Sequence, residues 1–558
     1  MIRPEDILPL ISSLVWLLAG VGIFIVGMNF LSNALEKSAG SGMKNLLGKI
    51  TNNRFSGVGI GAGVTAIIQS SSATSVMVIG LVNAGVLTLL QATSVIMGAN
   101  IGTTVTGLLV ALKNDYFNMI MYFFAFAGVM MGFFKKESVR LLGTLFSGLG
   151  LIFVGLSIMS SDQAFGSDLV SNVFTNIFET IDFPLLLIIV GAIFTALLQS
   201  SSAATGIVIT MVGTQILTLD AALFIILGAN IGTCVTALLA SIGANSNSKR
   251  VAFIHFAFNV IGSMFFAIII WIFKNPTVDF LTMCFPGEDQ TSLQMRVSLF
   301  HVIFNVTTTL LLLPFTKQLV KLSQLVIKEK AKDEESLSLK FIDDRLLTTP
   351  VIALTQVSKE VKYMMDLVEE NISSSFKSII TLSSKYTEKI TENEKIINFT
   401  NNELTKYLIK LTSVVDAKSE QTIGSYFHVL NDLERIGDHA ENFNEICLDL
   451  NKDKLSFSDT AKVDIENMQN KILEMLSIVK EIFLTKNKSR LEQLSQLEQQ
   501  VDNMKKDLTE KHFGRLADGK CSIELSPYYN SAITGLERVA DHLVNVGFSI
   551  VNPVGEEE

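Results

Sequence analysis

The sequence is poor in cysteine, in proline and, over its first 320 residues, in charge. Its four cysteines lie far apart and none has Cys-x-x-Cys spacing: Cys234, Cys284, Cys447 and Cys521. This scarcity argues against a disulfide framework and against a zinc site. The formal net charge of −9 also gives no support to nucleic-acid binding, which needs a basic surface.

The distribution of charge divides the chain into two regions. Residues 1–320 carry 14 Lys or Arg and 13 Asp or Glu, whereas residues 321–558 carry 30 and 40. Apolar runs in the first region reach the ~20 residues that a membrane-spanning helix needs. The clearest are Leu10–Leu31, Met119–Phe134, Leu141–Met159, Val251–Phe273 and Val297–Pro314. The first run has full spanning length and no small-residue cleavage site, so we expect a span and not a cleavable signal peptide.

Two nearly identical polar stretches interrupt the apolar region. Thr65–Ser75 reads TAIIQSSSATS, and Thr195–Thr205 reads TALLQSSSAAT, 130 positions later. A second pair has the same offset, with GANIGTT at Gly98–Thr104 and GANIGTC at Gly228–Cys234. Two independent motifs at one offset indicate an internal repeat. Cys234 replaces the threonine of the first copy, so we do not count it as a ligand.

The basic residues predict opposite orientations for the two repeats. Lys37 and Arg54 follow the first span and Lys135 opens another basic connection, so both connections are expected to be cytoplasmic. The equivalent connection of the second repeat, at 160–182, carries four acidic and no basic residues and is expected outside. We therefore expect an all-α, polytopic membrane domain at 1–320. It would hold two inverted-topology repeats, at about 10–134 and 141–273, and an extra span at 296–316.

A hydroxyl-rich break in a helix at membrane depth is costly unless it lines a cavity or meets a ligand. The start of a helix suits an anion, and hydroxyl, amide and carbonyl oxygens suit a hard cation such as sodium. Inverted repeats with interrupted helices are the usual pointer to a secondary transporter's binding site. The alternative is that serine lets helices pack closely, and the glycines of the second motif are equally open to that interpretation. The twin serine runs favour a site for an anion and a cation.

The motif His-x-x-Phe-Asn occurs twice, at His255–Asn259 and His301–Asn305. His and Asn four residues apart share one helix face, and an ionisable residue within a span is a functional candidate. Arg250 and Arg296 precede the two motifs closely, which places both near an interface. We favour a structural or gating role over direct ligand contact.

Together these motifs resemble the sodium/phosphate cotransporter family in its bacterial form. The resemblance covers residues 10–320. It implies re-entrant helical hairpins that face one another around inorganic phosphate through Gln69, Ser70, Ser71, Ser72, Gln199, Ser200, Ser201 and Ser202. Sodium is expected nearby, at Thr65, Thr195, Asn100, Thr103, Asn230 and Thr233. Phosphate as the anion comes from the resemblance alone.

Beyond a charged linker at 321–344, the chain has scarcely any proline or glycine and shows an apolar stripe at helical spacing. The run DLERIGDHAEN at Asp432–Asn442 returns as GLERVADHLVN at Gly535–Asn545, 103 residues later. Two tandem helical bundles, a soluble double three-helix-bundle domain, are therefore expected at 345–552.

These later runs resemble the PhoU regulatory domain, whose Glu-x-x-x-Asp pairs can bind metal clusters. Clustered carboxylates repel one another and favour a bound cation. The candidate ligands for a divalent or an iron- or zinc-type metal are Glu434, Asp438, Glu537 and Asp541. The alternative is ordinary surface salt bridging, since Arg435 and Arg538 are adjacent.

The sequence offers no catalytic constellation. Gly514–Cys521 has phosphate-loop spacing, but Cys521 stands where a Ser or Thr binds magnesium, and no strand is expected before it. A membrane-bound metalloenzyme would also lack a nucleophile–base pair. We therefore expect a protein that is not an enzyme.

The leading hypothesis is a sodium-dependent importer of inorganic phosphate in a bacterial inner membrane, with a cytoplasmic PhoU-like regulator. The lipid bilayer, phosphate and sodium are its expected partners, and a homodimer stays open. The alternative is a phosphate sensor or exporter whose C-terminal domain regulates phosphate homeostasis through partner proteins.

Overall fold

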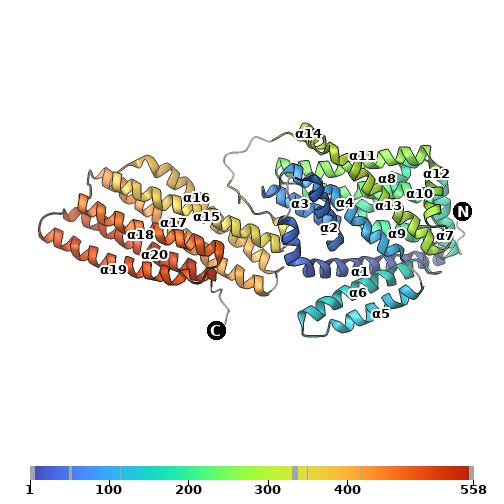
Figure 1. Cartoon of the computed structure of the whole chain (residues 1–558), viewed down its shortest axis with the longest axis horizontal. Coiled ribbons are helices and arrows are strands. Elements are labelled where there is room, and N and C mark those ends of the chain that lie inside the picture. Colours follow the sequence, from blue (N-terminus) through green and yellow to red (C-terminus); the bar gives the residue numbers. More distant parts are fainter. Residues whose placement is uncertain are drawn as a thin grey trace. The chain divides into compact units, whose positions relative to one another are not determined.

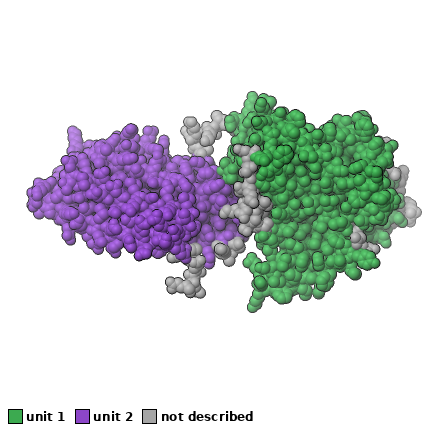
Figure 2. All heavy atoms as spheres, viewed as in Figure 1, with its two compact units in different colours: residues 1–331 green, residues 332–558 purple. Residues whose placement is uncertain are grey.

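The computed structural model describes residues 7–48, 53–112, 115–181, 183–329, 337–348, 350–415 and 417–551. Within these ranges every regular element is a helix (Figure 1), which confirms the predicted all-α fold. The chain forms two compact units, residues 1–331 and 332–558 (Figure 2).

The first unit is a bundle of apolar helices. Their bounds are α1 (Ile7–Gly48), α2 (Arg54–Ile68), α3 (Ser71–Asn83), α4 (Leu89–Ala111), α5 (Asp115–Met131), α6 (Glu137–Met159), α7 (Asp168–Thr180), α8 (Pro184–Leu198), α9 (Ser201–Gly213), α10 (Leu219–Ala240), α11 (Ser246–Ile272), α12 (Lys274–Cys284), α13 (Gln290–Leu312) and α14 (Thr316–Val326). In the described part of the chain, six helical segments are long and apolar enough to cross a membrane. The unit is therefore a polytopic membrane domain.

Two of the six spanning helices, α4 and α10, were absent from the apolar runs identified in the sequence. Both carry the Gly-Ala-Asn motif, whose Asn and Thr residues interrupt the apolar pattern. These helices are the most buried of the six, at 78% and 72% of their apolar windows. A helix that faces protein on most sides can carry polar residues that a lipid-facing helix cannot.

Glycines bring the first helices of the two repeats into backbone contact. A Cβ at Gly27 would lie 2.6 Å from the backbone N of Ile152, and one at Gly155 would lie 2.6 Å from that of Phe24. Phe24 of α1 lies beside Gly155 of α6, and the later Gly27 lies beside the earlier Ile152. The two helices therefore run antiparallel. The glycines of the second motif act in the same way, because Cβ atoms at Gly98 and Gly228 would clash with backbone carbonyls of α2 and α8. The packing interpretation of these glycines is therefore correct.

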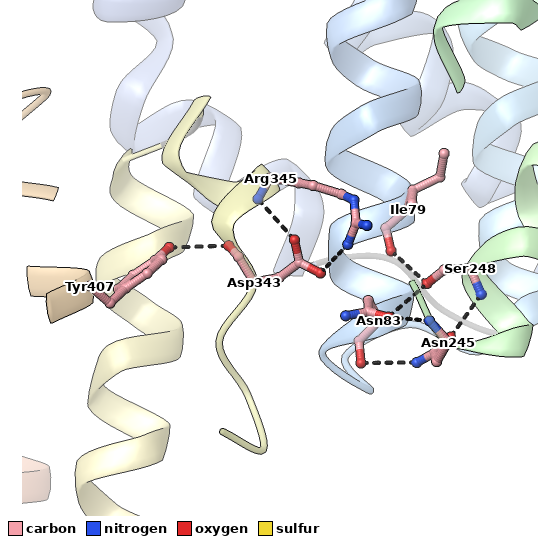
Figure 3. A network of polar contacts seen from close by, with 7 residues as sticks. All are labelled: Ile79, Asn83, Asn245, Ser248, Asp343, Arg345 and Tyr407. Atoms are coloured by element: carbon pink, nitrogen blue, oxygen red, sulfur yellow. Dashed lines mark hydrogen bonds and ion pairs between the residues drawn. The ribbon is translucent and has the colours of Figure 1, made fainter. Parts of the chain in front are cut away.

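Hydrogen bonds join the end of α3 to the start of α11. At the close of α3, the Asn83 carbonyl and side chain accept hydrogen bonds from Asn245, which caps α11 (3.2 and 2.8 Å, Figure 3). Ser248 donates to the carbonyl oxygen of Ile79 at 3.1 Å. These bonds attach the first hairpin to α11.

The second unit is a double three-helix bundle, as predicted. Its helices are α15 (Pro350–Thr381), α16 (Thr387–Thr412), α17 (Ala417–Lys452), α18 (Asp459–Thr485), α19 (Arg490–Ala517) and α20 (Ser526–Val551). The two bundles pack together through α17 and α20.

The stretch at 321–344, which the sequence predicts to be a linker, has helical or hydrogen-bonded structure at both ends. Its start is the last part of α14, and residues 330–336 lie outside the described ranges. Its end is bonded to the first bundle: Tyr407 donates to the carbonyl oxygen of Asp343 at 3.3 Å (Figure 3). Glu360 accepts from the backbone N–H groups of Lys340 and Phe341.

Candidate functional site

Each Gln-Ser-Ser-Ser run forms the turn of a helical hairpin. Gln69 ends α2 in the left-handed conformation (φ 58°), and Ser70 then caps α3 by accepting a bond from the N–H of Ala73 at 3.1 Å. Gln199 (φ 53°) and Ser200 repeat this geometry between α8 and α9. Because non-glycine residues rarely adopt positive φ, each glutamine marks a definite helix break. The predicted helical hairpins are present.

The two hairpin tips meet. Ser71 Oγ and Ser201 Oγ lie 3.4 Å apart, and both side chains are buried. Ser71 begins α3 and Ser201 begins α9, so two helix N-termini converge at this point. The partial positive charges and free N–H groups of helix N-termini together suit an anion.

Two threonines that the sequence reasoning missed complete the contact between repeats. Thr106 donates to Gln69 Oε1 at 2.7 Å and accepts from Ser202 Oγ at 3.4 Å. The hydroxyl of Thr236 lies 3.2 Å from Ser72 Oγ and 2.9 Å from the carbonyl oxygen of Thr233, so these two acceptors share its one proton. Thr106 and Thr236 are 130 positions apart and each follows its Gly-Ala-Asn-Ile-Gly-Thr run, so the repeat offset was the signal that could have found them.

The two glutamines have different surroundings. Gln69 is partly buried, and its amide also donates to the carbonyl oxygen of Ala66 at 2.6 Å. Gln199 is exposed. The greater exposure of the second run is confined to its glutamine, because later in the runs Ser202 is buried while its counterpart Ser72 is half-buried.

The residues expected to bind sodium are buried beside the hairpins. Asn100 and Asn230 donate amide N–H groups to the carbonyl oxygens of Ile96 and Ile226, one turn earlier in their own helices. Thr103 and Thr233 donate to their own helices in the same manner. An amide that donates its N–H keeps its oxygen for a further partner, so both asparagines fit a cation-binding role.

Thr65 and Thr195 occupy equivalent positions but differ in bonding. The hydroxyls of Thr65 and Thr74 are hydrogen bonded at 3.0 Å. At the position equivalent to Thr74 the second repeat has Ala204, and within the described residues the buried Thr195 hydroxyl has no hydrogen-bond partner. A buried hydroxyl without a partner is the expected sign of a ligand-binding position, so Thr195 is a candidate to supply an oxygen. Thr65 donates its O–H to Thr74 and therefore also keeps its oxygen lone pairs.

The two His-x-x-Phe-Asn motifs lie inside the bundle. Each asparagine amide donates to the carbonyl oxygen of its own histidine, from Asn259 at 3.0 Å and from Asn305 at 2.9 Å. Cys234 Sγ accepts from Asn259 at 3.3 Å, which joins α10 to α11. In the described ranges no hydrogen bond links either histidine ring to a Gln-Ser-Ser-Ser run. The ring Nδ1 atoms of both histidines and the side-chain oxygens of both asparagines are buried without a hydrogen-bond partner in the described residues. The structural or gating role of the motifs stays a prediction.

In the second unit, one acidic cluster has ligand atoms within 4.8 Å of one another: Glu498, Asp502 and Asp541. Burial, and then the neighbouring Glu537 and Asp502, raise the pKa of Asp541. Burial, and then Asp502, raise the pKa of Glu498. The sequence reasoning named Asp541 but missed the other two. The signal was present, because Glu498 and Asp502 have the same Glu-x-x-x-Asp spacing.

The other predicted metal ligands are arranged differently. Glu537 forms an ion pair with Lys505 at 2.9 Å, so salt bridging accounts for one of its oxygens. In the first bundle, burial and then the charge of Asp438 raise the pKa of Glu434. Asp438 itself is exposed.

Glu394 of α16 is a further acidic residue in the first bundle. Its side chain is buried against Gly437, where a Cβ would lie 2.7 Å from Glu394 Oε2. Burial, and then the charges of Asp438, Glu441 and Glu434, raise the pKa of Glu394 to about 8. The first bundle therefore holds an acidic group that is largely protonated at neutral pH.

The fold and the site define a polytopic membrane protein in which paired helical hairpins meet, joined to a helical two-bundle domain. The chain belongs to the Na+/Pi-cotransporter family, whose model matches residues 23–161 and 167–280. The PhoU domain model matches residues 361–447 and 465–550. Both predicted resemblances are confirmed.

Two of the relatives have names that refer to phosphate transport. The chain is 22% identical over 553 residues to the "Putative inorganic phosphate export protein YjbB" of Salmonella typhimurium, covering 98% of this chain and 99% of that protein. It is 31% identical over 212 residues to the human sodium-dependent phosphate transport protein 2B, covering 35% and 28%. An uncharacterised Bacillus subtilis protein, YqeW, is 31% identical over 313 residues, which cover 55% of this chain and 96% of YqeW. No solved structure matches the chain.

Proposed function

We propose that the protein is a sodium-coupled secondary transporter of inorganic phosphate, regulated by its PhoU domain. The observation that carries the proposal is the convergence of Ser71 and Ser201 at 3.4 Å, at the N-termini of two broken helices. The serines, the helix N-termini and the surrounding amides provide hydrogen-bond donors for a phosphate anion. The membership of this chain in the Na+/Pi-cotransporter family supports sodium and phosphate as the two solutes.

Sodium binding lowers the electrostatic cost of bringing phosphate to the hairpin tips. Thr195, Asn230 and Thr233 of the second repeat are the favoured ligands, because the buried Thr195 hydroxyl has no hydrogen-bond partner among the described residues. Rocking of one repeat against the other would expose the site to each side in turn. Inward movement of each net positive charge contributes ~2.3 kcal/mol per 100 mV.

The proposed setting is a bacterial inner membrane, with inverted repeats and a cytoplasmic second unit. The antiparallel packing of α1 and α6 supports opposite orientations of the repeats. In the second unit, Glu498, Asp502 and Asp541 would hold a divalent or an iron- or zinc-type cation, which would neutralise their mutual repulsion. We keep a homodimer as part of the proposal.

Radiolabelled phosphate flux in proteoliposomes tests the proposal. We expect uptake that rises steeply when an inward sodium gradient replaces an inward choline gradient. A variant carrying Ser71→Ala and Ser201→Ala, reconstituted at equal density, serves as the inactive control. Phosphate flux that ignores the sodium gradient would remove the coupling.

A phosphate exporter is the second candidate, since relatives named for phosphate export match 98% of this chain. The same vesicles, loaded with labelled phosphate and given an outward sodium gradient, measure efflux. Efflux that exceeds uptake under mirrored gradients would favour export. The alternative in which the second unit acts as a phosphate sensor needs a separate test. If cells keep an unchanged phosphate response after residues 332–558 are removed, that sensor role is excluded.

A further inference from the structure

The helix α14 follows the last membrane span and has three distinct sides. Thr316, Leu319 and Ser323 are buried and face the first unit, where α14 packs on α11 and α4. Together α13 and α14 form the apolar segment Gln290–Val326 of 37 residues, which at 1.5 Å per residue is roughly 55 Å long. Because a bilayer's hydrocarbon core is ~30 Å thick, this segment extends beyond the core, and α14 is its C-terminal end.

One exposed side of α14 is apolar. Leu322 and Val326 are four residues apart and so lie on the same side of the helix. Phe315 extends this strip toward the membrane span, and Leu325 borders it. Their exposed fractions are large: Phe315 53%, Leu322 39%, Leu325 76% and Val326 57%. Such a strip is unfavourable in water.

The other exposed side is basic. Lys317 and Lys321 are also four residues apart, and the exposed Lys328 follows the end of the helix. No ion pair within the described residues involves any of these three lysines. The helix thus presents an apolar strip beside a row of cations, with its third side fixed to protein.

Two arginines hold α14 in place at its ends. Arg54 donates to the carbonyl oxygens of Leu313 and Pro314, at 3.2 and 3.1 Å. Arg250 donates to that of Ile327 at 3.1 Å. Because Arg54 begins α2, the first helix of a hairpin, these bonds attach both ends of α14 to the transport unit.

We propose that α14 is a binding surface for the headgroups of anionic lipids. The apolar strip would enter the acyl boundary, while Lys317, Lys321 and Lys328 meet lipid phosphates at the surface. This is the pattern of an interfacial helix, in which lysine stems lie along apolar surface and their charges reach the headgroups. The acidic second unit is the competing partner for the lysines, but it would leave the apolar strip in water.

Lipid binding to the full-length protein in detergent tests the proposal. The probe is phosphatidylglycerol with a fluorescent tail, in the presence of excess phosphatidylcholine. The test variant is Lys317→Gln/Lys321→Gln/Lys328→Gln, and the control, Lys377→Gln/Lys454→Gln/Lys488→Gln, removes the same charge from exposed sites of the second unit. We expect binding to weaken roughly tenfold or more in the test variant and to be unchanged in the control. Replacing Lys317, Lys321 and Lys328 by arginine should retain the binding.

Equal lipid binding by the test and control variants would overturn the proposal. Hydrogen exchange on the full chain addresses the competing partner. Should the α14 substitutions leave lipid binding intact and instead increase exchange in the second unit, the lysines would belong to that unit, and the lipid surface would be refuted. The experiment measures lipid binding and not phosphate flux, so its result does not depend on the proposed transport function.

Discussion

Ser71 and Ser201 lie 130 residues apart in the chain, yet their hydroxyl oxygens are 3.4 Å apart in the structure. Each is the first residue of a helix that begins after a left-handed glutamine. Their proximity turns two equivalent motifs into one candidate site with two halves.

Replacing either serine should impair phosphate transport. A hydrogen bond to a charged group contributes about 1.5–3 kcal/mol, so Ser71→Ala and Ser201→Ala should each raise the apparent KM for phosphate by roughly 10-fold to 100-fold. Uptake in proteoliposomes measures this effect. Ser323→Ala, which removes a buried serine of α14 bonded to its own helix, is the control and should leave KM unchanged. Normal KM values in both site variants would contradict the proposed site.

The two bridging threonines should matter almost as much. Thr106→Val and Thr236→Val keep side-chain shape but remove the bonds to Gln69, Ser202 and Ser72. At about 1 kcal/mol for each net hydrogen bond lost, we expect the KM for phosphate to rise roughly fivefold in Thr236→Val, which loses one bond to the runs, and up to roughly 25-fold in Thr106→Val, which loses two. Thr93→Val is the matched control in α4, because Thr93 bonds only to its own helix. An equal effect of Thr93→Val would show that general packing, and not the bridge, is responsible.

Sodium dependence should separate Thr195 from Thr65. Thr195→Val removes an unbonded buried hydroxyl, whereas Thr65→Val removes one that is already bonded to Thr74. We expect the sodium concentration for half-maximal uptake to rise roughly tenfold in Thr195→Val, for the loss of about 1.4 kcal/mol, and to rise less in Thr65→Val. Ala204→Thr, which provides Thr195 with the partner present in the first repeat, should also weaken sodium activation. A larger effect at Thr65 would reverse the assignment.

Metal content should depend on the acidic cluster of the second bundle. Glu498→Gln/Asp502→Asn removes two of three clustered carboxylates, so we expect the purified protein to lose about one metal equivalent. Elemental analysis by mass spectrometry measures it. Glu466→Gln alters an exposed acidic residue of α18 and should retain the metal. If wild type and cluster variant hold the same metal, the cluster is not the ligand set.

Stability should fall with rising pH because of Glu394. The folded protein keeps a proton on this group up to a pKa of about 8, whereas an unfolded chain releases it near 4.5. The contribution of Glu394 is therefore complete below pH 4.5 and is lost as pH rises toward 8. Glu394→Gln, which mimics the protonated form, should raise Tm at pH 8 by roughly 2–8 °C and change it little at pH 4.5. Thermal scans of the full chain at both pH values measure this. An equal change in Tm at pH 4.5 and at pH 8 would contradict the raised pKa of Glu394.

Much of the fold could be predicted because it depends on local pattern. Gln69 and Gln199 stand in identical runs, so one hairpin predicts the other. The helices of the second unit follow from apolar spacing and from a near absence of proline and glycine. In contrast, α4 and α10 were missed as spans, because their burial by other helices permits polar residues that disguise a membrane segment.

The candidate site was only partly predictable. The sequence identified the Gln-Ser-Ser-Ser runs, but Thr106 and Thr236 lie on other helices and reach these runs only through tertiary packing, within one repeat at Gln69 and between repeats at Ser202 and Ser72. Glu498 and Asp502 have the Glu-x-x-x-Asp spacing, but the sequence did not show that they lie beside Asp541 of another helix. The spacing of residues along one helix predicts which of them share a face of that helix. It does not predict which faces of different helices pack together.

The sequence by itself therefore determined the helical fold, the repeat at an offset of 130 and the position of each helix break, since these depend on residues that are close in the chain. Only the tertiary structure decided that Ser71 meets Ser201, that Thr65 is bonded while Thr195 is not, and that α14 carries separate apolar and basic sides on a clamped helix. These relationships depend on how distant segments pack, because a hydroxyl or a charge acquires its partners only when the helices assemble.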